Sequence, residues 1–142
     1  MSGSTGQTTC VECVQGSYAL PSATACATCL AGSFSLNGAS TCTLCVAGRY
    51  NPVNDSSSCT DCSQGRAAPN AGMSTCNDCL KGTYADGPKR ITCQPCASGQ
   101  FQNATGQSFC YTCDEGTTSN GALSPSSCTR ESHPSLSESL SL

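Results

Sequence analysis

Pairs of cysteines separated by two residues recur along almost the whole chain, and this spacing constrains the fold more than any other feature. Seven pairs follow one another at a period of 16 to 17 residues, and a single cysteine closes the series. A regular period over so many copies indicates a repeat array rather than one globular domain. The pairs are Cys10/Cys13, Cys26/Cys29, Cys42/Cys45, Cys59/Cys62, Cys76/Cys79, Cys93/Cys96 and Cys110/Cys113, and Cys128 is the last cysteine.

Each unit also repeats the same turn and strand signals. Glycine stands three positions after the second cysteine of every pair, and an aromatic residue follows two positions later in five of seven units. Asn-Gly and related sequences midway between the pairs favour positive φ and chain reversal. No segment shows an apolar stripe at helical spacing. The sequence therefore predicts a small disulfide-rich fold, an elongated linear array of seven short two-stranded β-hairpin units with little or no helix. In each hairpin a Gly-x-aromatic strand would pair with a Ser/Thr-Cys strand.

Composition agrees with a fold held together by covalent bonds. Leu, Ile, Val and Phe together number 17 of 142 residues, whereas cysteine contributes 15. A chain with so little apolar surface to bury depends on disulfides more than on a core. Because cytosolic reductants would keep these thiols reduced, the sequence predicts an extracellular or luminal protein.

Charge and hydropathy argue against two classes of partner. Six Lys and Arg and nine Asp and Glu are dispersed along the chain, so no nucleic-acid surface is expected. No apolar run approaches the roughly 18 residues of a membrane-spanning helix. Residues 1–9 lack the features of a secretory leader, and we interpret them as the flexible end of a missing upstream unit. Residues 10–128 hold the seven repeats, and the Ser/Leu-rich residues 129–142 are expected to be disordered.

Three pairing schemes are open to the cysteines. Closure within each pair would create seven strained redox centres without the βαβ frame that such centres use. Combining neighbouring pairs two by two would double the period, yet the loops do not alternate and seven pairs cannot be divided by two. Bonding the second cysteine of each pair to the first of the next keeps the period at one unit.

The sequential scheme also explains why the series ends on a single cysteine, and it is the one we expect. It leaves Cys10 unpaired, and this thiol is expected to link copies of an otherwise monomeric chain into dimers. The predicted bonds are Cys13–Cys26, Cys29–Cys42, Cys45–Cys59, Cys62–Cys76, Cys79–Cys93, Cys96–Cys110 and Cys113–Cys128.

The pattern Cys-x-x-Gly-x-Tyr/Phe, then Ser/Thr-Cys-x-x-Cys, resembles the ephrin-type A/B receptor-like cysteine-rich repeat. In its first loop it is similar to the cysteine modules of tumour-necrosis-factor receptors. The resemblance covers Cys10 to Cys128 and implies extracellular, disulfide-linked rods without catalytic residues. We therefore expect a non-enzymatic spacer, adhesion or ligand-presenting module of a larger secreted or cell-surface protein, with a protein or glycan ligand that the sequence does not identify.

An intracellular zinc-ribbon-like array that mediates interactions is the alternative, because two successive Cys-x-x-Cys pairs fall near ribbon spacing. Loops that do not alternate, an odd number of pairs and few Lys and Arg argue against it. We therefore expect no metal and no other cofactor. Thiol titration with mass spectrometry on the native protein would separate the two readings.

Other candidate sites are individually weak. Glu12, Asp61, Asp78 and Asp114-Glu115 lie in or beside cysteine pairs, but neutral residues stand there in other units, so we interpret them as surface charge rather than Ca²⁺ ligands. His133 lies in the tail, away from any ligand set or nucleophile. Two sequons make Asn54 and Asn103 candidates for N-glycosylation.

Overall fold

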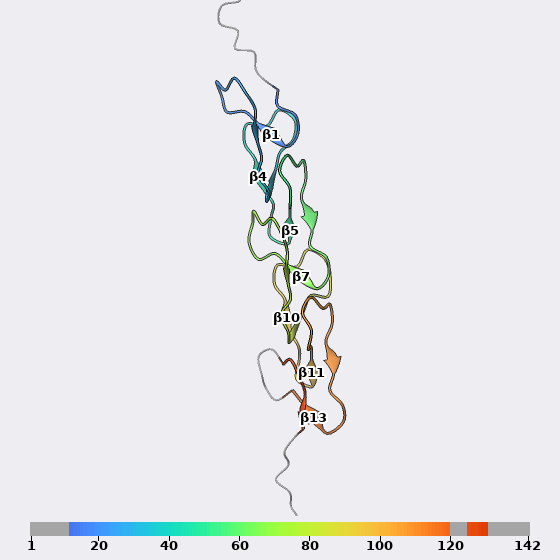
Figure 1. Cartoon of the computed structure of the whole chain (residues 1–142). Helices are drawn as coiled ribbons and strands as arrows, with labels where there is room; N and C mark the ends of the chain where they lie inside the picture. Colours follow the sequence, from blue (N-terminus) through green and yellow to red (C-terminus); the bar gives the residue numbers. More distant parts are fainter. Residues whose placement is uncertain (1–11, 120–124, 131–142) are drawn as a thin grey trace, which may run out of the picture.

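The computed structural model describes residues 12–119 and 125–130, and over these residues the chain forms a narrow rod (Figure 1). Fourteen two-residue strands pair into seven antiparallel hairpins, and the described residues contain no helix. This confirms the predicted array. The strands are β1 (Ser17–Tyr18), β2 (Ala27–Thr28), β3 (Ser33–Phe34), β4 (Thr43–Leu44), β5 (Arg49–Tyr50), β6 (Thr60–Asp61), β7 (Arg66–Ala67), β8 (Asn77–Asp78), β9 (Thr83–Tyr84), β10 (Gln94–Pro95), β11 (Gln100–Phe101), β12 (Tyr111–Thr112), β13 (Thr117–Thr118) and β14 (Thr129–Arg130).

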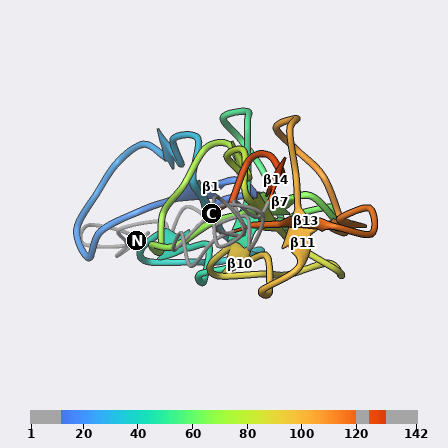
Figure 2. The same ribbon diagram turned by 90° about the horizontal axis from the view of Figure 1, so that it is seen from below.

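We number the hairpins 1 to 7 in chain order, so that hairpin 1 is β1–β2 and hairpin 7 is β13–β14. Viewed along the rod, the loops project to the sides around a centre where the strands gather (Figure 2). Strand β14 takes the first two residues that the sequence assigned to the tail. Residues 1–9, Cys10 and residues 131–142 lie outside the described residues.

The constant spacing of glycine after each cysteine pair corresponds to a tight turn before the first strand. In hairpin 3, the backbone N–H of Arg49 donates to Val46 O over 3.0 Å, and Gly48 between them has a φ of 86°. Positive φ at the third position defines a type II turn, for which glycine is the favoured residue. The same bond closes the turn of all seven hairpins.

The second strand of each hairpin lies later in the chain than predicted. Instead of falling on Ser/Thr-Cys, β6 occupies the two residues between Cys59 and Cys62. The reason is the register, since Cys62 donates its backbone N–H to Gly48 O over 3.0 Å. That bond sets the two residues before Cys62 opposite β5, and Cys59 is left just beyond the paired residues, where its disulfide reaches Cys45.

Backbone hydrogen bonds in a fixed pattern join consecutive hairpins. At the junction of hairpins 3 and 4, Gly48 N–H donates to Ala68 O over 2.8 Å and Gly72 N–H donates to Cys45 O over 2.7 Å. A third bond runs from Asn51 N–H to a loop carbonyl. The same three bonds recur at every junction from hairpin 1 to hairpin 6. They pair backbone groups that an isolated two-residue hairpin would leave exposed.

The residue directly after the aromatic position forms the buried centre of the rod. In hairpins 2 to 7 this residue is at most 4% exposed. Its side chain is small or carries a hydrogen-bonding group, and the polar members bond to neighbouring backbone: Ser35 Oγ donates to Ser17 O over 2.8 Å, and Asn51 Nδ2 donates to Ser33 O over 2.7 Å. The buried residues of this column are Ser35, Asn51, Ala68, Ala85, Gln102 and Ser119.

Each turn glycine from hairpin 1 to hairpin 4 also touches the hairpin after the next one. A Cβ placed on Gly48 would lie 2.4 Å from Lys89 O in the loop of hairpin 5, and one on Gly32 would lie 2.1 Å from Gly72 O in hairpin 4. The hairpins therefore contact more than their nearest neighbours in the array. The absent side chain lets the backbones of hairpins n and n+2 meet, so the rod is tied together over three successive units.

The loop residue that meets the turn glycine itself has positive φ. Glycine takes this position in hairpins 2, 4 and 6, as Gly38, Gly72 and Gly106, whereas hairpins 1, 3 and 5 carry Ser22, Asp55 and Lys89 there. The backbone N–H of Asp55 donates to Cys29 O over 3.0 Å, and the equivalent bonds hold the loops of hairpins 2 to 6 against the preceding unit. A left-handed conformation costs a residue with a Cβ about 1–2 kcal/mol.

Replacing Asp55 by glycine should therefore stabilise the rod. Its φ of 60° lies in the left-handed region, which glycine adopts more readily than aspartate. Because glycine also gains freedom in the unfolded chain, we expect a net gain of about 0.5–1 kcal/mol rather than the full strain. The control is Asp55→Ala, which removes the same carboxylate but keeps the Cβ. Chemical denaturation of the oxidised proteins measures both, and an equal gain from Asp55→Ala would contradict the strain argument.

Candidate interaction surface

Seven disulfides join the fourteen cysteines of the described residues, each closing its own hairpin. The second cysteine of one pair bonds to the first cysteine of the next, and all seven Cα–Cα distances lie between 5.6 and 5.8 Å, within the usual range. The bonds are Cys13–Cys26, Cys29–Cys42, Cys45–Cys59, Cys62–Cys76, Cys79–Cys93, Cys96–Cys110 and Cys113–Cys128.

The sulfurs contribute most of the apolar interior. The second cysteine of each pair is nearly inaccessible from Cys13 to Cys96, but Cys113 in the last hairpin is only half-buried. In the middle of the rod, Tyr50 and Met73 pack against a buried cluster of Cys62, Ala68 and Cys76. Tyr50 of hairpin 3 thus helps to cover the disulfide of hairpin 4.

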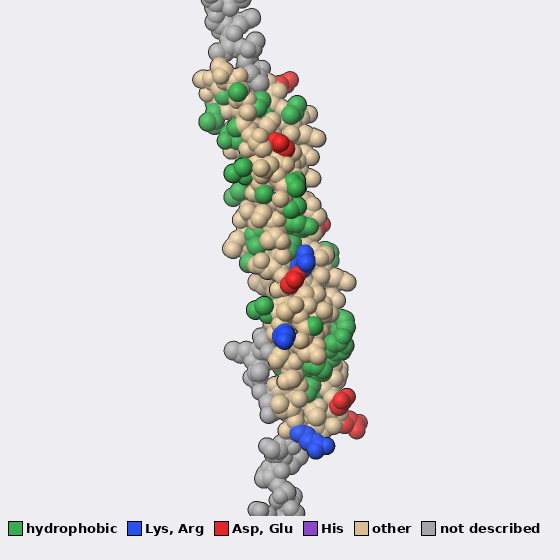
Figure 3. All heavy atoms as spheres, in the orientation of Figure 1, with side chains coloured by type: hydrophobic (Ala, Val, Ile, Leu, Met, Phe, Trp, Pro, Cys, Tyr) green, Lys and Arg blue, Asp and Glu red, His purple; other side chains and the backbone are tan. Residues whose placement is uncertain are grey.

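Large apolar side chains lie mostly on the outside. Among them are four that directly follow a cysteine pair, each between 62% and 71% exposed: Val14, Leu30, Val46 and Leu80. Figure 3 shows hydrophobic side chains scattered at the surface along the described rod, with few charged groups between them. Burying these residues is not what holds the fold together, so they are available for contact with other molecules.

An apolar hollow of about 680 Å³ lies between hairpins 1 and 2. Three leucines and an aromatic ring contribute to it: Leu20, Leu30, Leu44 and Tyr18. The leucines are each more than half exposed. An open hollow lined in this way suits an apolar or aromatic group of a partner better than a charged one.

A second hollow, of about 490 Å³, occupies the equivalent position between hairpins 6 and 7. Phe101 replaces Tyr18 in the repeat alignment, Asn103 replaces Leu20, and Asp114 replaces Leu30. The same backbone therefore presents an aliphatic surface near one end of the rod and a mixed aromatic and polar surface near the other.

Charged residues pair between the two strands of hairpin 3 and between the two strands of hairpin 4. Arg49 Nε lies 2.7 Å from Asp61 Oδ1 and Arg66 Nε lies 2.6 Å from Asp78 Oδ1, each pair between directly opposed strand residues. Lys89 Nζ of hairpin 5 also lies 3.5 Å from Asp61 Oδ2, which adds an ionic contact between hairpins 3 and 5. These side chains are between 38% and 54% exposed, so each pair contributes little stability.

The remaining acidic candidates lie on the surface. Glu12, Asp114 and Glu115 are exposed. No group of three or more potential metal-ligating side chains occurs within residues 12–119 and 125–130. His133 lies outside these ranges.

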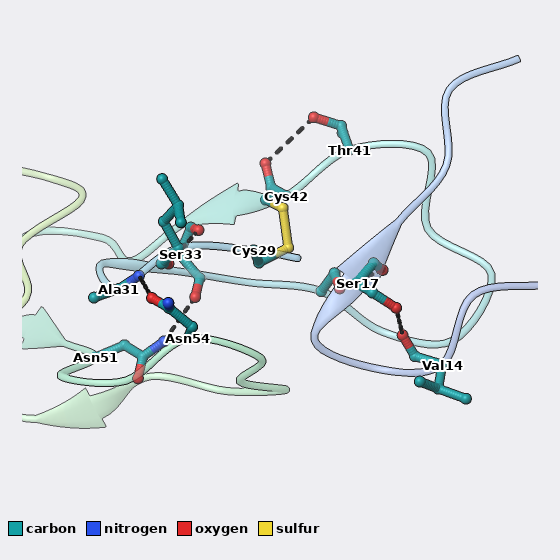
Figure 4. Close-up of a disulfide and its surroundings, with 11 residues drawn as sticks. Val14, Ser17, Cys29, Ala31, Ser33, Thr41, Cys42, Asn51 and Asn54 are labelled. Atoms are coloured by element: carbon teal, nitrogen blue, oxygen red, sulfur yellow. Dashed lines mark hydrogen bonds between the residues drawn. A yellow bond between two sulfur atoms is a disulfide. The ribbon is translucent and has the colours of Figure 1, made fainter. Parts of the chain in front are cut away.

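The two sequon asparagines have different surroundings. Asn54 Oδ1 accepts a hydrogen bond of 2.9 Å from Ala31 N–H, in the turn of the preceding hairpin (Figure 4). Asn37 makes the equivalent bond to Gln15 N–H over 2.8 Å, so this loop position supports the junction. Asn103 lies on the wall of the hollow between hairpins 6 and 7, and its exposed side chain makes no hydrogen bond to another described residue.

Comparison with known proteins supports the family resemblance over part of the chain. Residues 32–72 match the tyrosine-protein kinase ephrin type A/B receptor-like family. No curated protein matches the chain. In the described residues, no helix has the length and apolar character needed to cross a bilayer. Over residues 32–72 the chain is thus similar to the ephrin receptor-like repeat, and the seven disulfides and seven hairpins of the described residues form a small disulfide-rich repeat array.

Proposed function

We propose that this chain is a non-enzymatic extracellular spacer that holds and presents other parts of a secreted or cell-surface protein. The observation that carries the proposal is the repeated junction. From hairpin 1 to hairpin 6, each hairpin bonds to the next through the same three backbone hydrogen bonds, so added units lengthen the rod without enlarging a core. The ephrin receptor-like match supports it, because that repeat is a non-catalytic module.

The surface supports a role in presentation and adhesion. Large apolar side chains project outward along the described rod, and the hollows at its two ends differ in lining while sharing a backbone. Open hollows lined by leucine or by aromatic and amide groups suit contacts with a protein or a glycan. These hollows do not resemble the enclosed, pre-organised pockets with acid–base pairs that catalysis needs.

Small-angle scattering of the oxidised monomer tests the spacer. A compact chain of this length would have a radius of gyration near ~14 Å, and the stack of hairpins should clearly exceed that value. Full reduction should abolish the rod profile, since no core remains to hold the hairpins. A Cys10→Ser variant removes dimers linked through that thiol and serves as the control for monomer shape.

A radius near the compact value for the oxidised monomer would overturn the spacer. Thiol titration beside the scattering measurement separates the zinc-ribbon alternative. The sequential disulfides predict one free thiol in the native chain, because 15 cysteines minus the 14 in disulfides leaves Cys10. Fifteen thiols that react only after metal chelation would instead support a zinc array.

A further inference from the structure

An exposed aromatic cluster lies beside the Asn103 sequon. Phe101 on β11 is directly opposite Tyr111 on β12, and their ring centroids are 5.7 Å apart. Phe109 meets Tyr111 edge-on at 5.0 Å. Phe109 and Tyr111 remain 48% and 45% exposed, so the protein leaves much of this cluster uncovered.

Side chains of an extended chain point alternately to its two sides, which places Asn103 on the same side as the rings. Gln102 points inward, is fully buried, and uses its amide to bond Phe109 O and Ala104 N–H over 2.7 and 3.1 Å. Its two neighbours, Phe101 and Asn103, therefore face outward together, and both line the hollow between hairpins 6 and 7. Gln102 holds this arrangement in place from behind.

We propose that Asn103 carries an N-linked glycan whose innermost N-acetylglucosamine packs on Phe101 and Tyr111 in this hollow. The C–H groups of a sugar ring are weakly positive and suit the negative face of an aromatic ring. The hollow, of about 490 Å³, leaves room for a sugar against the rings. The first sugar would thus cover apolar surface that the protein leaves exposed.

The transfer is the ordinary one for sequons. The Asn103 Nδ2 bonds to C1 of N-acetylglucosamine, and the bond from C1 to the pyrophosphate of a lipid-linked oligosaccharide breaks. Nδ2 loses one proton, and the lipid pyrophosphate leaves. Thr105 supplies the hydroxyl of the sequon and is exposed. The inference requires that the chain enter the secretory pathway, but it does not depend on the rod acting as a spacer.

Asn54 is the matched control within the same molecule. Pro52, not an aromatic residue, stands two positions before it, and its side-chain oxygen is occupied by Ala31 N–H. A sugar on Asn54 would therefore lack the ring beneath it that Phe101 provides at Asn103. Any glycan there should behave as a mobile, solvated group.

The test uses the full chain secreted from eukaryotic cells behind an added leader. Intact mass before and after enzymatic release of N-glycans should show Asn103 occupied, and Asn103→Gln should lose that glycan while Asn54→Gln retains it. After trimming to one sugar, the acetyl methyl resonance of the Asn103 sugar should be shifted upfield by the rings. Phe101→Leu and, separately, Tyr111→Leu should reduce that shift.

Two results would overturn the proposal. The first is an unmodified Asn103 in secreted, oxidised protein. The second is an occupied Asn103 whose sugar resonances match those of a denatured glycopeptide or are unchanged in both ring variants. A failed spacer would instead appear as a small radius of gyration in scattering, so the two proposals fail separately.

Discussion

The double variant Cys62→Ser, Cys76→Ser is expected to lose about 3 kcal/mol or more from the middle of the rod. Removing a disulfide that closes a loop of this length releases about 3 kcal/mol of chain entropy into the unfolded state. The two sulfurs also belong to the buried cluster with Ala68, against which Tyr50 packs, so hydroxyls would enter an apolar environment.

Amide hydrogen exchange locates the loss. The N–H of Cys79, bonded to Gly65 O over 2.9 Å, closes hairpin 4 and should exchange at least 100-fold faster. Protection should fall less in hairpins 2, 3, 5 and 6, which touch hairpin 4 directly or through the contacts of n with n+2. Hairpins 1 and 7 should change least.

The control removes the last bond, Cys113→Ser with Cys128→Ser. Its loop is of similar length, but Cys113 is half-buried and the described residues place no further hairpin against it. The loss should be confined to hairpins 6 and 7. Equal loss of protection along the whole rod in both variants would contradict the one-dimensional stack.

Gly48→Ala should strongly destabilise the rod although it leaves every cysteine in place. A left-handed backbone costs alanine about 1–2 kcal/mol. In addition, the new Cβ would lie 2.4 Å from Lys89 O, and forcing these backbones apart adds roughly 1–3 kcal/mol. The separation should weaken the bond from Lys89 N–H to Cys62 O as well.

Gly99→Ala provides the matched comparison. Gly99 has nearly the same φ, 81° against 86°, but a Cβ there would meet no atom of the described residues within 4 Å. This variant should show only the left-handed cost, about 1–2 kcal/mol. Denaturation of the oxidised proteins, with exchange of the Lys89 amide, measures the difference. Indistinguishable losses would show that the contact between hairpins 3 and 5 is unimportant.

The sequence predicted the architecture because its strongest signals are local and repeated. A glycine at a constant distance from each cysteine pair predicted a turn, and the hairpins follow from it. The position of the second strand was missed, because the bond from Cys62 N–H to Gly48 O sets the register and no residue type marks it.

Contacts between hairpins n and n+2 were missed for a different reason. Because Gly48 has no side chain, it can both form the turn and allow the backbone of Lys89 to approach closely. The sequence indicates only the turn. One signal was available: from hairpin 1 to hairpin 6, the loop position of positive φ alternates between glycine in even hairpins and another residue in odd ones. The loops had been treated as equivalent, and this position shows that they are not.

The buried column was hidden because it lacks large apolar residues. Ser35, Asn51 and Gln102 look like surface residues in composition, yet their polar groups bond to backbone inside the rod. The hollows follow from pairs of adjacent hairpins, so neither could be located before the stacking was known. The sequon at Asn103 could be recognised directly in the sequence, but the position of the aromatic rings beside it could not.

The disulfide pattern has a mechanical consequence. If the two ends were pulled apart, the tension would pass through the disulfide of each hairpin and through the short segment between the two cysteines of each pair. The loop that the disulfide closes would carry none of it. Three residue steps from Cys26 to Cys29 span about 10 Å when taut, and the next bond adds 5.7 Å between Cα atoms. A reduced unit could stretch to about 55 Å, whereas an oxidised one stops at about 16 Å. Under tension the oxidised chain is a tether of limited extensibility, and reducing a single bond would release slack at one defined place.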